Sequence, residues 1–406
     1  MILKLPSFGR DARVNALIGC GHFLSHYYQL CLPPLFLAWQ RAFGVSFAEL
    51  GLAMALMSGT AAVAQAPIGF LVDRYGARRF LVGGALLMAL AIAAMSLATA
   101  YWQIVLLATL SGLGNSVFHP ADYAILSGSI DRARIGRAFA CHTFVGQVGF
   151  AAAPPVTAAL MLLVGWRSAL ALVGVLGIPV VLAILWQSRI LVEPQREARQ
   201  RGAGVAGDLR QLFSRSILSF FGFFMVSAMA GAAVQAWLIT ILHRIHGLTL
   251  AAASSALTAY MTGMMIGVLL GGWVAERTRR HLGFVVAMTM IGAAMLLAVD
   301  AVTLPQLATI AVMFAAGLSF GARNTPRDVM VKDVAAPGQM GKVFGFVSAG
   351  MALGSAIMPV PYGMLIDAGR PELVLIAAAG LSIASLLFAG NARAARRREA
   401  VAVAAE

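Results

Sequence analysis

The stretch Gly69-Phe70-Leu71-Val72-Asp73-Arg74-Tyr75-Gly76-Ala77-Arg78-Arg79 decides how this chain folds, because it is a charged turn between two long apolar runs. The turn recurs 203 positions later, where Gly272-Trp273-Val274-Ala275-Glu276-Arg277-Thr278-Arg279-Arg280 keeps the glycine, the acid and the basic pair. Such a repeat predicts that one structural unit occurs twice in the chain.

Three further pairs of motifs support the duplication. Pro120-Ala121-Asp122 matches Pro326-Arg327-Asp328 at an offset of 206 positions. At an offset of 205, Gly136 to Phe139 matches Gly341 to Phe344, and Pro154 matches Pro359. Four matches in one order, with similar offsets, are unlike a chance similarity of apolar helices. In transporters, repeats of this kind form a binding site at the membrane midplane, around which two halves rock.

The composition is that of a membrane protein: 60% of the 406 residues are hydrophobic and 11% are charged, with a mean hydropathy of +0.84. Crossing a bilayer as a helix takes about 20 apolar residues. Runs of this length occupy residues 15–39, 47–72, 80–100, 102–125, 137–163, 166–190, 216–242, 250–275, 282–302, 305–330, 342–366 and 372–389. We therefore predict an all-α membrane protein with twelve transmembrane helices in two pseudo-symmetric six-helix halves.

The basic residues predict the orientation. Alternate loops and both termini hold 26 of the 30 Lys and Arg residues, and the opposite side holds only Arg41, Arg167, Arg244 and Arg370. Because basic segments stay in the cytoplasm, both termini and the central loop are expected there. The predicted domains are a six-helix bundle at 1–190, a cytoplasmic linker at 191–215, a second bundle at 216–391 and a basic tail at 392–406. The net charge of +14 thus indicates topology and not a nucleic-acid partner.

Other site chemistry is not expected. Cys20, Cys31 and Cys141 lie in apolar runs without metal-ligand spacing, so neither a disulfide framework nor a metal site is predicted. No phosphate-binding loop or catalytic triad occurs, so we expect neither a cofactor nor an enzyme. No removable signal peptide is evident at the N-terminus. Arg outnumbers Lys 27 to 3, which favours a GC-rich bacterial genome and hence the bacterial inner membrane.

The turn at residues 69–79 resembles the signature loop of the major facilitator superfamily, and every defined position is met. The resemblance implies a solute carrier without a cofactor, with a small-molecule substrate and the lipid bilayer as partners; we expect a monomer. The turn is then a conformational latch whose charge pairs break as the halves rock, or simply an exposed loop that sets topology. The latch residues would be Gly69, Asp73, Arg74, Gly76 and Arg78, with Asp122 or Asp131 as partner for Arg78, and Glu276 and Arg277 in the second copy.

A finer resemblance, to the fosmidomycin-resistance branch, comes from Gly21-His22-Phe23-Leu24-Ser25-His26 and from the Gly112 to Pro120 segment. That branch includes proton-driven drug exporters. Two departures leave the direction of transport open: Ala108 stands where many proton-coupled relatives have arginine, and the fifth-helix glycine-proline pattern at residues 146–155 is degraded.

Polar residues on single helix faces mark a predicted substrate and proton cavity. In the first run Asn15, His22, His26, Gln29 and Pro33 share a face. Ionisable groups inside a membrane usually face protein or water, and histidine titrates near neutral pH, so His22 and His26 either bind or couple protons, or only hydrogen-bond neighbouring helices. The other candidates are Asn115 and His119 in the fourth run, His142 in the fifth, Gln235, Tyr260, Arg323 and Asn324.

Arg323 has two possible roles. It either binds an anionic substrate group or is neutralised by Asp328, five residues later. The leading prediction for the whole chain is proton-coupled efflux of a drug-like or antimicrobial compound by alternating access. The alternatives are proton-coupled uptake of an organic anion and, in another class, a membrane receptor that keeps the carrier fold without moving solute.

Overall fold

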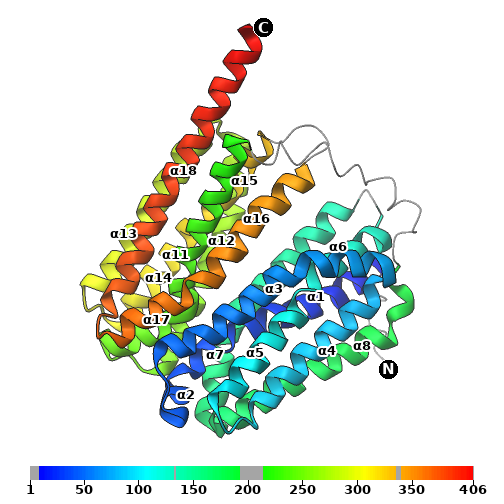
Figure 1. The fold of residues 1–406 in the computed structure, drawn as a ribbon, viewed down its shortest axis with the longest axis vertical. Helices are drawn as coiled ribbons and strands as arrows, with labels where there is room; N and C mark the ends of the chain where they lie inside the picture. Colours follow the sequence, from blue (N-terminus) through cyan, green and yellow to red (C-terminus); the bar gives the residue numbers. More distant parts are fainter. Residues whose placement is uncertain (1–8, 132–133, 193–213, 335–339, 406) are drawn as a thin grey trace, which may run out of the picture. The chain divides into compact units, whose positions relative to one another are not determined.

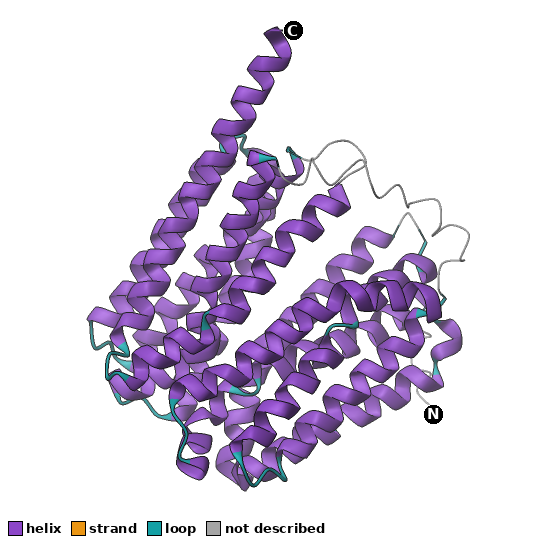
Figure 2. Cartoon of the chain, in the orientation of Figure 1, coloured by secondary structure: helices purple, strands orange, loops and turns teal. Residues whose placement is uncertain are grey.

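The chain forms helices throughout the part that the structure, a computed structural model, describes: residues 9–131, 134–192, 214–334 and 340–405 (Figures 1 and 2). The side chains of 73, 136, 340–342 and 392–405 lie outside this description, and so does nearly all of the predicted linker. The first half contains α1 (Arg10–Leu30), η1 (Pro33–Leu35), α2 (Phe36–Phe43), α3 (Phe47–Tyr75), α4 (Ala77–Met95), α5 (Tyr101–Asn115), α6 (Phe118–Ser129), α7 (Ile135–Val175), α8 (Gly177–Trp186) and η2 (Ser188–Ile190).

The second half repeats the pattern with α11 (Arg215–His246), α12 (Leu250–Arg277), α13 (His281–Ala301), α14 (Gln306–Ala322), α15 (Asn324–Lys332), α16 (Met340–Ile357), α17 (Pro359–Asp367) and α18 (Glu372–Ala405). The all-α fold predicted from the sequence is therefore confirmed.

Ten helical stretches among the described residues are long and apolar enough to cross a membrane, which is consistent with the predicted twelve. One of the ten covers 50 residues, Arg137–Trp186, and is interrupted at Gly165, whose φ of 78° lies in the region that favours glycine. It therefore accounts for two of the predicted runs, 137–163 and 166–190. The predicted first run, which overlaps α1, is not among the ten, because α1 carries several polar side chains and is followed by Pro33 and Pro34.

Two helices are broken at equivalent positions of the repeat. The break between α5 and α6 precedes Pro120, and the break between α14 and α15 precedes Pro326, 206 positions later. Proline lacks an N–H, and its ring clashes with the carbonyl four residues earlier, here that of Ser116 or of Ala322. The two helices therefore break in the same place for the same reason, and in both halves the break brings polar residues inside.

Glycines let α12 and α14 approach each other closely. A Cβ at Gly263 would fall on the carbonyl oxygen of Phe314, and one at Gly317 would fall on that of Tyr260. Helices in membranes commonly pack through such small residues, because dispersion contacts and not water exclusion hold them together.

Two compact units divide the described fold: Met1–Gln29 with Thr60–Ala153 and Leu160–Ala203, and Leu30–Gly59 with Pro154–Ala159 and Gly204–Glu406. Leu30–Gly59 groups with second-half helices because its aromatic residues pack on α11: Trp237 lies 5.1 Å from Phe36 and 6.0 Å from Phe47, between ring centroids. The predicted division at residues 190 and 216 follows the repeat and not these contacts, and it stays a prediction.

Candidate functional site

Four histidines and one aspartate cluster inside the first unit. They come from three helices: His22 and His26 from α1, His119 and Asp122 from α6, and His142 from α7. The ring of His22 is central, with its centroid 3.9 Å from that of His142, 4.2 Å from that of His26 and 5.5 Å from that of His119. The structure thus brings together all four histidines that the sequence selected for the predicted cavity.

Local sequence explains why these side chains meet. His22 and His26 are four residues apart, and His119 and Asp122 are three apart, so each pair shares one helix face. Helix α7 comes close to α1 because Gly146 and Gly149 have no side chain: a Cβ at Gly146 would fall on the His22 ring, and one at Gly149 on the backbone of Phe23.

Asp122 lies in this cluster and not with the loop residues to which the sequence interpretation assigned it. Its side chain is 0% exposed, and its Oδ2 is 3.6 Å from both Nδ1 of His22 and Nε2 of His142. These separations are too long for hydrogen bonds. Both carboxylate oxygens are buried without a hydrogen-bond partner among the described residues, an arrangement that costs free energy unless a ligand or ion compensates it.

Gln29 and Asn115 meet beside the histidines, because both side-chain amides donate to the backbone carbonyl of Ser25, over 3.2 Å and 3.5 Å. These two predicted cavity residues therefore connect α1 with the end of α5. His26 also stacks on Phe150, at 4.1 Å between centroids, although no sequence motif marks Phe150 as a neighbour.

Arg323 is the buried cation of the second unit. It stands at the break between α14 and α15 and is 6% exposed. One terminal nitrogen donates to Oγ1 of Thr289 over 3.1 Å, and the guanidinium lies 4.8 Å from the Phe320 ring centroid. Its Nε is buried without a partner in the described part of the chain.

Asp328 does not neutralise Arg323. Its carboxylate pairs with Arg327, over 2.8 Å to 2.9 Å, and Arg327 also covers the Phe224 ring. Of the other predicted cavity residues in this unit, Tyr260 is buried next to Phe320, whereas Gln235 and Asn324 are half-buried. Of the two roles expected for Arg323, pairing with Asp328 is therefore not the one observed.

The turn at residues 69–79 has the expected sharp geometry. Gly76 has φ 103° and ψ 136° between α3 and α4. Arg78 donates to the carbonyl of Ser188 over 3.0 Å, and in the second copy Glu276 and Arg277 are exposed, with Arg277 donating to the carbonyl of Trp273. The carboxylate of Asp73 lies outside the described side chains, so the latch with Gly69 and Arg74 stays a prediction.

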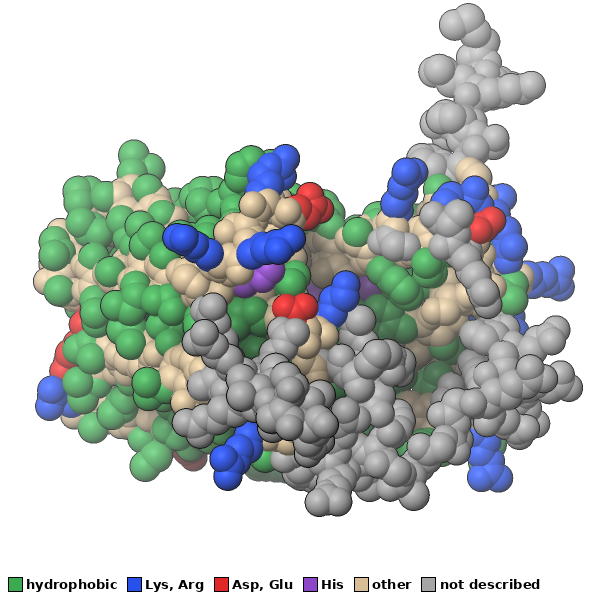
Figure 3. Space-filling model, turned by 90° about the horizontal axis from the view of Figure 1, so that it is seen from above, with side chains coloured by type: hydrophobic (Ala, Val, Ile, Leu, Met, Phe, Trp, Pro, Cys, Tyr) green, Lys and Arg blue, Asp and Glu red, His purple; other side chains and the backbone are tan. Residues whose placement is uncertain are grey.

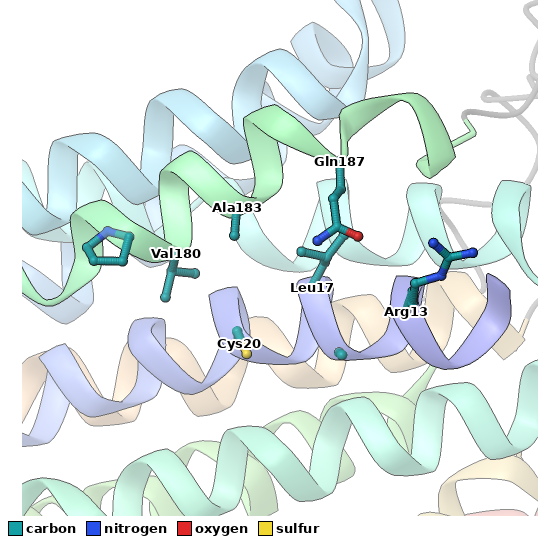
Figure 4. Close-up of a pocket in the computed structure, with 8 residues that line it drawn as sticks. Arg13, Leu17, Cys20, Val180, Ala183 and Gln187 are labelled. Atoms are coloured by element: carbon teal, nitrogen blue, oxygen red, sulfur yellow. The ribbon is translucent and has the colours of Figure 1, made fainter. Parts of the chain in front are cut away.

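Two cavities adjoin α1 within the first unit. In Figure 4 the side chains of Arg13, Leu17 and Cys20 face those of Val180 and Ala183 on α8 and of Gln187 directly after it. They surround a mainly apolar space of about 320 Å³. The second, of about 460 Å³, lies between α1 and the first turns of α7. Lys and Arg side chains project among hydrophobic ones on the face in Figure 3.

Sequence comparison places the chain in a known group. The model of the Major Facilitator Superfamily matches residues 18–254 and 221–405. The uncharacterized MFS-type transporter YfnC of Bacillus subtilis is 25% identical over 91% of this chain and 90% of its own length, and the multidrug resistance protein MdtH of Cronobacter sakazakii is 26% identical over 75% of each. The probable L-galactonate transporter of Escherichia coli is 32% identical, but over only 35% of this chain and 31% of that protein.

The same fold occurs in a bacterial homologue of the human lysosomal transporter Spinster, solved in an inward-facing, unoccupied conformation. The TM-score is 0.79 at 16% identity, over 96% of this chain and 98% of that one. The fosmidomycin-resistance branch stays a prediction, whereas the wider resemblance is confirmed. The chain is a multi-pass membrane protein and a transporter rather than an enzyme, and it belongs to the major facilitator superfamily.

Proposed function

We propose that this chain is a proton-driven secondary carrier of small organic anions that works by alternating access in the bacterial inner membrane. The observation that carries the proposal is Arg323, a buried guanidinium that no ion pair joins to a carboxylate among the described residues. An unpaired charge is costly inside a membrane protein, and a carboxylate of the substrate would supply the missing partner. The planar guanidinium suits a carboxylate, because two of its N–H groups donate in parallel.

A relative supports the same substrate class. The probable L-galactonate transporter, which matches about a third of the chain, is named for a sugar acid. Proton coupling, which the sequence interpretation assigned to His22 and His26, belongs to the proposal, as do cytoplasmic termini and a monomeric carrier. The experiment below measures the direction of transport relative to the imposed pH gradient.

The test is uptake by the purified full chain in proteoliposomes with an imposed pH gradient. The panel contains sugar acids including L-galactonate, simple monocarboxylates, the matching neutral sugars and a lipophilic cation. We expect saturable, gradient-dependent transport of an acid, and a rise in KM of more than about tenfold in Arg323→Gln, which corresponds to the loss of one charge-assisted hydrogen bond. Arg327→Gln is the matched control, because Arg327 pairs with Asp328. Transport confined to the lipophilic cation would contradict the proposal.

Drug efflux is the second candidate, since MdtH is a relative over three quarters of the chain. Expression in a drug-sensitive host separates the two: efflux predicts higher resistance that Asp122→Asn abolishes, whereas anion transport predicts unchanged resistance.

Counterflow of a labelled ligand in the same proteoliposomes tests the receptor alternative, because a receptor binds its ligand without exchanging it across the membrane.

A further inference from the structure

We infer that His22, Asp122 and His142 form a binding site for a divalent transition-metal ion. The inference goes beyond the proposed function and does not depend on it. The three side chains come from α1, α6 and α7 and are only 3%, 0% and 1% exposed, so the fold buries a carboxylate and two imidazoles at one point. Sequence reasoning predicted no metal site, because these residues are 100 and 20 positions apart and form no local motif.

The distances between the three groups fit an ion better than hydrogen bonds. Oδ2 of Asp122 is 3.6 Å from Nδ1 of His22 and 3.6 Å from Nε2 of His142, and one ligand atom of each residue lies within 4.8 Å of the others. Ligands about 2.0–2.1 Å from a tetrahedral zinc ion are about 3.3 Å apart. A small inward movement of the side chains would therefore complete the coordination.

The polar atoms at this point lack partners. Of the six side-chain nitrogen and oxygen atoms of the three residues, five are buried without a hydrogen bond among the described residues: Nδ1 of His22, both oxygens of Asp122 and both ring nitrogens of His142. Buried polar atoms are nearly always satisfied, so such a group needs an explanation. One cation coordinates all three side chains at once, whereas a single proton bridges only one pair of atoms.

The ligand set indicates which ions fit. Two imidazoles and one carboxylate suit Zn²⁺, Fe²⁺, Co²⁺ or Ni²⁺, whereas Ca²⁺ and Mg²⁺ prefer oxygen ligands alone. Three protein ligands leave one position of a tetrahedral ion open for water or another group. The buried carboxylate offsets part of the charge of the ion, which lowers the cost of placing it inside the protein.

A cavity lies along two of the helices that supply the triad, α1 and α7. The cavity of about 460 Å³ is lined by Gly19 and Cys20 of α1 and by Cys141 of α7, which come shortly before His22 and His142 in their helices. The thiols of Cys20 and Cys141 are free and exposed.

The test is metal binding by the purified full chain in detergent after removal of metals with a chelator. Co²⁺ is titrated with visible absorption as the readout, and Zn²⁺ is then added as competitor. We expect one Co²⁺ per chain, with the intense absorption of a four-coordinate ion, displaced by Zn²⁺. Asp122→Asn and His142→Gln should each weaken binding by more than about tenfold. Each removes a direct ligand, and loss of a group that only contacts a ligand already costs about tenfold or more. His281→Gln, which removes a histidine that contacts the Ala275 carbonyl, is the control.

A further variant keeps all three ligands and changes only the position of one of them. Gly146→Ala places a methyl group against the His22 ring, and we expect it to displace the imidazole and weaken Co²⁺ binding while the protein stays monodisperse in size-exclusion chromatography. The inference is overturned if the unaltered chain binds no Co²⁺ or Zn²⁺, or if Asp122→Asn binds them as tightly as the unaltered chain. If His281→Gln weakens Co²⁺ binding as much as the ligand variants do, the ion binds adventitiously to other histidines, and the inference is also overturned.

Discussion

The carboxylate of Asp367 caps the first turn of α3, 320 positions earlier in the chain: Oδ1 accepts from the backbone N–H of Phe47 and Oδ2 from that of Ala48, both over 2.8 Å. Ser46 and Glu49 complete the cap, since the Glu49 carboxylate accepts from the Ser46 N–H over 2.8 Å and the Ser46 hydroxyl from the Glu49 N–H over 3.2 Å. The first N–H groups of α3, which have no partner within the helix, are thus satisfied by one local residue pair and one distant carboxylate.

Because Asp367 joins the end of α17 to the start of α3, Asp367→Ala should loosen this contact. Loss of a capping acceptor costs about 1 kcal/mol, and here it also removes a link between the two copies of the repeat. We expect a lower melting temperature and a larger population of conformations in which this end of α3 is open. The backbone N–H groups of Phe47 and Ala48 should then exchange faster with deuterium from the solvent. Asp367→Asn, which keeps one acceptor oxygen, is the control, and equal exchange rates in all three proteins would contradict the prediction.

Two glycines of α3 offer a matched pair. A Cβ at Gly51 would fall on the carbonyl oxygen of Pro359, whereas one at Gly59 would lie 3.5 Å from the Cβ of Ala356, an ordinary contact. Gly51→Ala should therefore force α3 away from α17 and lower both transport and thermal stability, by about 1–3 kcal/mol as for other overpacked sites. Gly59→Ala should leave both unchanged. Equal behaviour of the two variants in thermal unfolding would contradict the packing argument.

The sequence predicts the fold well because the decisive patterns are local. Runs of apolar residues set the helices, and the prolines at 120 and 326 break two of them at equivalent positions. The Ser46–Glu49 cap is also a local pattern, three residues apart. Asp367 could not be predicted as its partner, because 320 positions separate them and only the packed helices bring them together.

The candidate site could be predicted only in part, for the same reason. Helix periodicity puts His22 and His26 on one face, but it does not say which faces of neighbouring helices meet. The position of Asp122 between His22 and His142 therefore could not be predicted from the sequence. Five residues advance a helix by about 140° beyond one full turn at 3.6 residues per turn, so Arg323 and Asp328 point to different sides. Helix geometry therefore counts against a pair between Arg323 and Asp328.

Gly76 is the position of the signature turn with the strongest backbone requirement. Its φ of 103° and ψ of 136° lie in a region that residues with a Cβ rarely adopt, and a side chain there costs about 1–3 kcal/mol. We expect Gly76→Ala to lower transport and the melting temperature. Gly83→Ala in α4 is the control, because a Cβ there meets nothing within 4 Å. Transport at the original rate in Gly76→Ala would show that the turn tolerates another geometry and would remove it from the latch hypothesis.

The separation of Arg323 from Asp328 leads to a prediction that distinguishes substrate binding from structural pairing. Asp328 is 40% exposed at its side chain and pairs with Arg327, and an exposed pair of this kind contributes at most about 1 kcal/mol. Asp328→Asn should therefore leave the KM for the transported anion unchanged, whereas Arg323→Gln should raise it. If Asp328→Asn instead raised KM as much as Arg323→Gln, the carboxylate would be acting on the buried guanidinium, and the geometry described for the second unit would not be the one that binds substrate. Because Asp328→Asn keeps the size of its side chain, this variant reports the charge of the carboxylate and not a change in packing.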